Sequence, residues 1–143
     1  MFSLRMNKYL TKETKPWGYE LILAPEGANI MAKILHVNQG QRCSLQYHEQ
    51  KEEVLVLTNG RAKIINGTDR NNLSEEEMEK DKGYLITPGL IHRFQAITDC
   101  DIFESSTPEK GTTFRLEDDY RRTDESEEIG KKERAENLSS KNE

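Results

Sequence analysis

Turn-forming residues interrupt this sequence so often that only short strands fit between them. They recur at intervals of about 8–12 residues through most of the chain. They include Pro-Glu-Gly at 25–27, Asn-Gln-Gly at 38–40, Asn-Gly at 59–60 and 66–67, and Pro-Gly at 88–89. No long segment before residue 117 has apolar residues at the helical period. The pattern predicts an all-β fold, either a sandwich or a small barrel.

The segments between the turns are rich in branched, aromatic and other apolar residues, as strands are. Strands are expected at residues 17–24, 30–37, 41–48, 53–57, 61–65, 84–87, 91–97 and 101–105. Residues 68–82 fit more than one structure. Ser74 and Glu77 match a capping box for one helical turn, and a polar hairpin is an alternative. We favour a loop that ends in a short strand near Met78.

The charged residues of the 143-residue chain are unevenly distributed. Of the 27 residues from 117 to 143, 16 are charged, and their net charge of -4 accounts for most of the chain's -5. We therefore expect an N-terminal arm (1–12), a barrel (13–116) and a charged tail (117–143). The tail has too few apolar residues to bury, so a solvated, disordered segment is expected. A frayed helix over 125–138 and an interaction segment are the alternatives.

Composition also excludes several classes of protein. The nearly neutral body lacks the clustered basic residues of a nucleic-acid-binding surface. No apolar run approaches the roughly 20 residues of a membrane span, and residues 1–12 do not resemble a signal peptide. Cys43 and Cys100 are too few for a disulfide framework, so a cytoplasmic protein is expected.

A candidate set of metal ligands lies on the predicted strands: Gln46, His48, Glu53 and His92. Gln46 and His48 are two residues apart in one strand, so their side chains leave the same face. Glu53 begins the next strand after a four-residue turn, and His92 follows the Pro-Gly turn at 88–89. Two imidazoles, one carboxylate and one amide suit zinc, iron, manganese, nickel or cobalt, and suit calcium poorly. On residue type alone, an ordinary solvent-facing polar surface is the favoured alternative.

The spacing of these residues resembles the two signature motifs of the cupin superfamily. Residues 40–60 read Gly-x5-Gln-x-His-x4-Glu-x6-Gly, which matches the first motif except that glutamine replaces its first histidine. Residues 87–92 read Thr-Pro-Gly-Leu-Ile-His: Gly89 and His92 match the core of the second motif, whereas Thr87 replaces its first proline and Ala96 replaces its closing asparagine. The resemblance implies a cupin double-stranded β-helix, a jelly-roll-like small barrel, with a divalent metal held by Gln46, His48, Glu53 and His92.

Further segments resemble one cupin branch, that of the type II phosphomannose isomerases and the cupin domain of mannose-1-phosphate guanylyltransferases. Residues 44–48 read Ser-Leu-Gln-Tyr-His and residues 15–20 read Lys-Pro-Trp-Gly-Tyr-Glu, and both are typical of that branch. The resemblance covers residues 13–122. It implies a zinc-dependent or related aldose–ketose isomerase for a sugar or sugar phosphate, and it suggests polysaccharide synthesis. It also implies a homodimer, for which the stripe Cys43, Leu45 and Tyr47 fits either an interface or packing within the chain.

Isomerisation of this kind moves a proton between two carbons, so it needs a base beside the metal. Glu104, on a late strand, and Lys33, on an early strand of unknown orientation, are the candidate catalytic residues. Arg42, Arg93 and Tyr84 are the candidate substrate contacts, although a straight strand would turn Arg93 away from the metal face. A cupin that binds or senses a sugar without turnover is the alternative function. A metal-dependent dioxygenase fits the ligand set less well.

Overall fold

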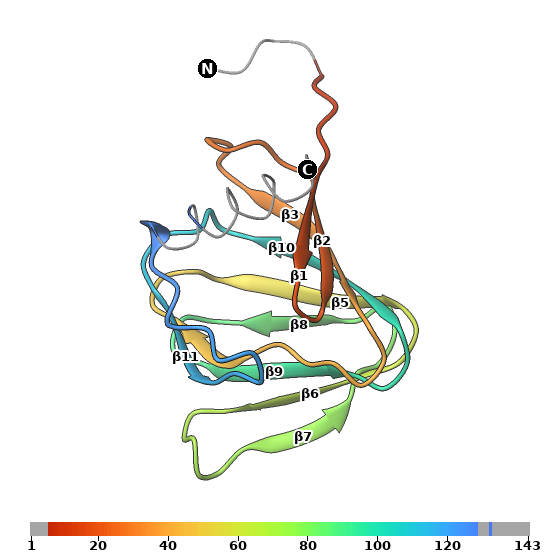
Figure 1. The fold of residues 1–143 in the computed structure, drawn as a ribbon, viewed down its shortest axis with the longest axis vertical. Helices are drawn as coiled ribbons and strands as arrows, with labels where there is room; N and C mark the ends of the chain where they lie inside the picture. Colours follow the sequence, from red (N-terminus) through yellow and green to blue (C-terminus); the bar gives the residue numbers. More distant parts are fainter. Residues whose placement is uncertain (1–5, 129–131, 133–143) are drawn as a thin grey trace.

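The computed structural model describes residues 6–128 and 132, and these form an all-β structure of two antiparallel sheets (Figure 1). The larger sheet has the order β1 (Thr11–Lys15), β2 (Gly18–Ile22), β3 (Met31–Val37), β10 (Cys100–Ser106), β5 (Glu53–Asn59) and β8 (Gly83–Ile86). The smaller sheet has the order β11 (Thr113–Glu117), β4 (Leu45–His48), β9 (Ile91–Ala96), β6 (Ala62–Gly67) and β7 (Ser74–Glu77). Among the residues described, no helix has the length and apolarity needed to span a membrane.

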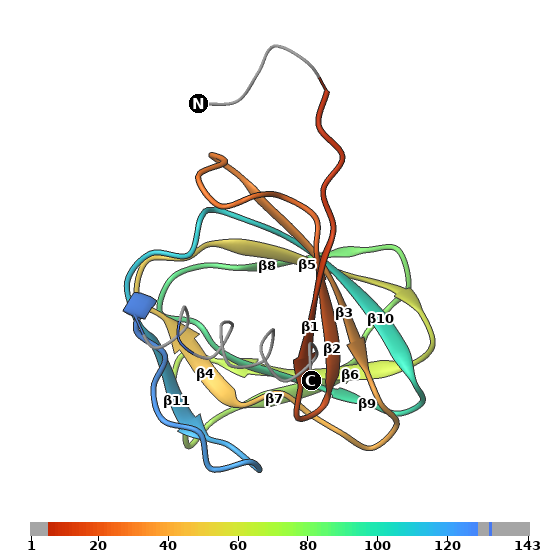
Figure 2. The ribbon, with the colours of Figure 1, turned by 45° about the horizontal axis from the view of Figure 1, so that its top comes forward.

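The two sheets close into a barrel because consecutive strands alternate between them, as in a jelly roll (Figure 2). From β3 to β6, and again from β8 to β11, each strand lies in the sheet opposite its predecessor. This winding brings strands that are distant in sequence side by side. Gln46 of β4 is directly opposite His92 of β9. The predicted fold class is therefore confirmed, and the winding unites the two motif regions.

The apolar core lies between the sheets and follows the period of two that strands impose. On β5, Leu55 and Leu57 are buried, whereas Val54 and Val56 face outward and are half-buried. Trp17 contributes from outside the strands and packs edge-on against a β9 ring, Phe94, at a centroid distance of 6.4 Å. Each such buried side chain stabilises the fold by roughly 1.5–3 kcal/mol. The core thus fixes how the two sheets lie against each other.

The two glycines of the first motif, Gly40 and Gly60, both have positive φ angles, 80° and 79°. A Cβ at Gly60 would collide with the Asp99 carbonyl oxygen and lie 2.9 Å from the Cys100 Cα, whereas one at Gly40 meets nothing within 4 Å. We expect Gly60→Ala to lower the free energy of unfolding by about 3 kcal/mol, and Gly40→Ala by only about 1 kcal/mol. Urea denaturation of the two variants measures this difference, and equal losses would contradict the steric argument.

Residues 68–73 are a loop that leads into the short strand β7 (Ser74–Glu77), which ends beside Met78, as favoured from the sequence, and β7 completes a polar hairpin with β6. All four residues of β7, Ser74–Glu77, are exposed, and they pair with the neighbouring strand β6 at the edge of the smaller sheet. Met78 follows the strand, is 4% exposed, and its N–H donates to the Ala62 carbonyl at 2.8 Å. A strand with no buried residue lacks the apolar alternation by which strands are recognised, and this is why the sequence pattern left several structures open for this segment.

The charged tail turns back to the barrel immediately after β11, a strand that the sequence pattern did not predict. Asp119 accepts two hydrogen bonds from the Arg42 guanidinium, at 2.7 and 2.8 Å. Further on, Glu125 and Thr113 exchange backbone hydrogen bonds of 2.8 and 2.9 Å. The first part of the tail is therefore held by specific partners. The helix considered over 125–138 falls mostly outside the described residues.

The stripe considered for a dimer interface packs within the chain. Cys43 and Leu45 are buried, and Tyr47 stacks on Phe114 of β11 at a centroid distance of 4.9 Å. A different apolar row crosses the outer face of the larger sheet, where half-buried side chains lie in register: Leu21, Ile34, Phe103 and Val56. The homodimer stays a prediction, and this row is the surface that favours it.

Candidate metal centre

Three of the four expected ligands meet inside the barrel. His48 ends β4, Glu53 begins β5 and His92 lies on β9, so both sheets contribute to the cluster. The ligand atoms of these residues all lie within 4.8 Å of one another, and none of the three is more than 4% exposed. The four-residue turn between β4 and β5 and the pairing of β4 with β9 therefore produce a possible metal site.

The hydrogen bonds of the two imidazoles prepare them for a metal ion. His92 Nδ1 lies 2.9 Å from the Leu90 carbonyl oxygen, which can only accept, so this nitrogen holds the proton. The other ring nitrogen of His92, Nε2, faces Glu53 Oε1, 3.3 Å away, and can bind a metal ion when the ring carries a single proton. The Thr113 hydroxyl can accept in the same way from His48 Nδ1 at 2.8 Å, and His48 Nε2 lies 3.2 Å from Glu53 Oε1. Three electron-pair donors facing one point fit a divalent cation.

Burial reinforces this arrangement. Burial is the largest influence on the pKa of His48 and lowers it, although Glu53 acts to raise it. Burial alone would raise the pKa of Glu53, but Lys51 and the two histidines outweigh it and hold that pKa well below its usual range. A neutral imidazole and an ionised carboxylate are the protonation states in which these groups bind metal.

Gln46 lies on the same face as His48 and lines the same cavity. The Ser44 hydroxyl donates to the Gln46 amide oxygen, which orients the amide. An amide oxygen has a second lone pair, so this contact leaves Gln46 able to act as a metal ligand. Gln46 therefore stays the expected fourth ligand.

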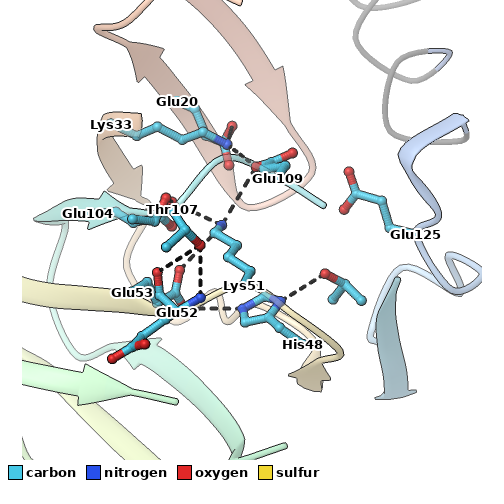
Figure 3. A network of polar contacts seen from close by, with 12 residues as sticks. Glu20, Lys33, His48, Lys51, Glu52, Glu53, Glu104, Thr107, Glu109 and Glu125 are labelled. Carbon is cyan, nitrogen blue, oxygen red and sulfur yellow. Dashed lines mark hydrogen bonds and ion pairs between the residues drawn. The ribbon is translucent and has the colours of Figure 1, made fainter. Parts of the chain in front are cut away.

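Lys51, which the sequence analysis missed, lies beside the cluster (Figure 3). Its side chain is 9% exposed, and its ammonium lies 3.3 Å from Glu53 Oε2 and 3.0 Å from Glu104 Oε2. Burial alone would lower the pKa of Lys51, but the surrounding carboxylates outweigh burial and raise it. A lysine in a turn is usually exposed, so no local signal indicated that this one points inward.

The two predicted catalytic residues both line the cavity. Glu104 and Lys33 are cross-strand neighbours on β10 and β3, and each is 5% exposed. Burial raises the pKa of Glu104 to about 7 against the opposing effect of Lys51. Lys33 forms ion pairs with Glu109 at 2.6 Å and Glu20 at 3.7 Å, and these carboxylates raise its pKa although burial alone would lower it. Lys33 is therefore a charged group in a network.

The cluster and this network share one cavity of about 310 Å³. Both sheets line it, and so does the returning tail through Arg122, Glu125, Ser126 and Glu127. Glu125 also makes an ion pair of 3.1 Å with Arg115 of β11, which fixes the tail beside the opening. The volume lies at the lower end of the range of about 300–1,000 Å³ found for small-molecule sites. The lining is predominantly polar and charged, which suits a hydroxylated ligand.

The three expected substrate contacts are not among the residues that line this cavity. Arg93 is 3% exposed and donates to the backbone carbonyls of Cys43 and Glu117, so it ties strands together. Arg42 pairs with Asp119, as described above. The Tyr84 hydroxyl accepts a hydrogen bond of 2.8 Å from the backbone N–H of Glu79. The cations that do line the cavity are Lys15, Lys33, Lys51, Lys110, Arg115 and Arg122.

A jelly-roll barrel with a buried His–Glu–His cluster in its cavity defines a cupin. Residues 5–125 match the model of the family described as "Mannose-6-phosphate isomerase C-terminal", and the chain belongs to this family. A search of curated proteins found no match.

Solved structures with the same fold include proteins of several kinds. The capsular polysaccharide assembling protein CapF from Staphylococcus aureus is 15% identical with a TM-score of 0.57, over 82% of this chain and 34% of that one. Oxalate decarboxylase from Bacillus subtilis is 16% identical with a TM-score of 0.63, over 80% of this chain and 33% of that one. KdgF from Halomonas sp. is 12% identical with a TM-score of 0.58, over 71% of this chain and 89% of that one. The chain thus spans about a third of the first two, and these similarities show the fold alone.

Proposed function

We propose that this protein is a metal-dependent aldose–ketose isomerase acting on a sugar or sugar phosphate. One observation supports this most directly. The His48–Glu53–His92 cluster and the Glu104–Lys51 ion pair lie in one buried network and are joined through Glu53. A metal site beside a carboxylate that can accept a proton is what an enediol reaction needs. Membership of the mannose-6-phosphate isomerase C-terminal family supports the same chemistry.

In this proposal His48, Glu53 and His92 hold a divalent ion, with Gln46 as the fourth protein ligand. When bound, the ion supplies a Lewis acid that polarises the substrate carbonyl. Zinc suits two imidazoles and a carboxylate. Manganese is the second candidate ion, because a structural study of the oxalate decarboxylase from Bacillus subtilis names Mn(II) centres. Metal analysis of the purified protein distinguishes the two ions.

Glu104 is the proposed base that takes the proton from C2 of the substrate and returns it to C1. Its carboxylate is fixed on the cavity wall by Lys51 at 3.0 Å and by the neighbouring strand that holds Lys33. Lys33 is the poorer base, because its ion pairs with Glu20 and Glu109 favour the protonated form. We assign Lys33 to binding an oxygen of the substrate instead.

The test is proton exchange at C2. Zinc- or manganese-loaded protein is incubated in deuterated water with mannose 6-phosphate and other aldose phosphates, and the C2 proton signal is followed by NMR. We expect loss of the C2 signal together with formation of the ketose phosphate, and neither with protein treated with a chelator. If no substrate exchanges with either metal, the isomerase proposal fails.

A sugar-binding cupin without turnover is the second candidate. The observation that favours it is the ion pair of Glu104 with Lys51, because a paired carboxylate is a weaker base. The same experiment separates the two functions, since this candidate predicts binding of the sugar without exchange at C2. For either function, the likeness to a capsular polysaccharide assembling protein supports a role in polysaccharide synthesis.

A further inference from the structure

A glutamate from a surface loop reaches into the cavity and lies between its two most deeply buried lysines (Figure 3). Glu109 belongs to the connection between β10 and β11, and its Oε1 lies 2.6 Å from Lys33 Nζ and 3.6 Å from Lys51 Nζ. The lysine side chains are 7% and 9% exposed. One carboxylate oxygen therefore bridges two ammonium groups, as an anionic ligand would.

Glu109 differs from the other carboxylates that contact these lysines. Glu20 and Glu104 are on strands, and their side chains are 12% and 7% exposed. The Glu109 side chain is 31% exposed. It therefore has room to rotate from the lysines toward solvent, whereas the strand carboxylates are more deeply buried and have less.

Backbone hydrogen bonds hold both ends of the loop in place. The N–H of Thr107 donates to the Glu52 carbonyl at 3.0 Å, and the N–H of Glu49 donates to the Thr112 carbonyl at 2.9 Å. These anchors confine any rearrangement to the few residues around Glu109. Exchange of the glutamate for a ligand would leave the rest of the barrel unchanged.

The charges of the network are consistent with such an exchange. With every group ionised, two ammonium groups face four carboxylates, a net charge of -2: Lys33, Lys51, Glu20, Glu53, Glu104 and Glu109. A divalent ion on the adjacent cluster would make the set neutral, and departure of Glu109 would then leave one positive charge. A buried positive charge without a partner is costly, so a ligand anion is favoured in the vacated position.

We propose that Lys33 and Lys51 form the anion subsite of this cavity and that Glu109 occupies it until the carboxylate or phosphate of a substrate displaces it. The inference rests on the proposed function in that it concerns the ligand entering the same cavity. It adds the chemical class of that ligand, an anionic sugar, and a residue that competes with it.

Binding of three sugars to zinc-loaded wild type and Glu109→Gln, measured by isothermal titration calorimetry, tests the proposal. Mannose 6-phosphate provides a phosphate, glucuronate provides a carboxylate, and mannose is the neutral control. We expect Glu109→Gln to bind at least one of the two anions about tenfold more tightly than wild type and mannose with unchanged affinity, because an internal competitor is removed. The sugar that gains more identifies the anion.

Glu127→Gln is the matched control, because Glu127 lines the same cavity but contacts Gly111 N–H at 2.8 Å, not the lysines. If Glu127→Gln gained as much affinity for the anions, the effect would be one of net charge. If Glu109→Gln gained as much affinity for mannose, the effect would be one of access to the cavity. Either result would overturn the proposal. Absence of a gain for both anions, in Glu109→Gln and Glu109→Ala alike, would also overturn it. Binding requires no turnover, so this result is independent of exchange at C2.

Discussion

The double variant His48→Ala/His92→Ala is expected to lose zinc affinity by more than about 100-fold. Changes to residues that only orient metal-binding histidines typically cost about 10–100-fold, and removal of two ligands exceeds that. In the wild type, Nε2 of each imidazole lies within 3.3 Å of the same Glu53 oxygen. The variant leaves Glu53 with Lys51 as its partner, which cannot replace the lost nitrogen donors. Metal content after dialysis and competition with a chromophoric chelator measure the change.

The third histidine of the chain supplies the control. His36 lies on the outer face of the larger sheet, where its Nδ1 is 2.7 Å from Asp101 and its ring stacks on Tyr19. His36→Ala removes an imidazole without touching the cavity, so zinc binding should match the wild type. Ligand binding also stabilises a fold, by about 2.7 kcal/mol at a free concentration 100 times the dissociation constant. A zinc-dependent rise in melting temperature that survives in the double variant would contradict the assignment.

Part of the ligand set, Gln46, His48 and Glu53, could be predicted from the sequence because local rules determine it. Strand alternation puts Gln46 and His48 on one face, and a four-residue turn returns the chain so that Glu53 lies beside them. The position of His92 does not follow from local rules. It depends on the pairing of β4 with β9, which only the resemblance of both motifs to one superfamily indicated.

The charged network beyond the cluster could not be predicted in the same way. Lys51 and Glu109 come from turns, where the pattern gives no inward or outward direction, and they are held by partners distant in sequence. Arg93 illustrates the opposite case. Alternation correctly turned it away from His92, and the structure gives it backbone carbonyl partners that no sequence pattern specifies. Local periodicity thus predicts which face a residue occupies, but not the ionic partners it finds there.

The second large effect is expected for the proposed base. Glu104→Gln should lower the rate of C2 exchange by about 100- to 10,000-fold, which is the usual contribution of a positioned general base. The amide is nearly the same size and keeps an oxygen toward Lys51, 3.0 Å from the carboxylate in the wild type, so the network is preserved. Zinc content should stay at the wild-type level, because Glu104 is not among the ligands of the cluster.

Glu20→Gln is the matched variant for this measurement. Glu20 lines the same cavity with a side chain 12% exposed, and it pairs with Lys33 at 3.7 Å, whereas Glu104 pairs with Lys51. Removing its charge alters the field of the cavity to a similar degree but takes no carboxylate from beside the metal cluster. We therefore expect Glu20→Gln to lose less than about tenfold in rate, as a change in electrostatics alone would. Similar losses in both variants would mean that Glu104 acts through the charge of the network, and the proton would then need another acceptor in the cavity.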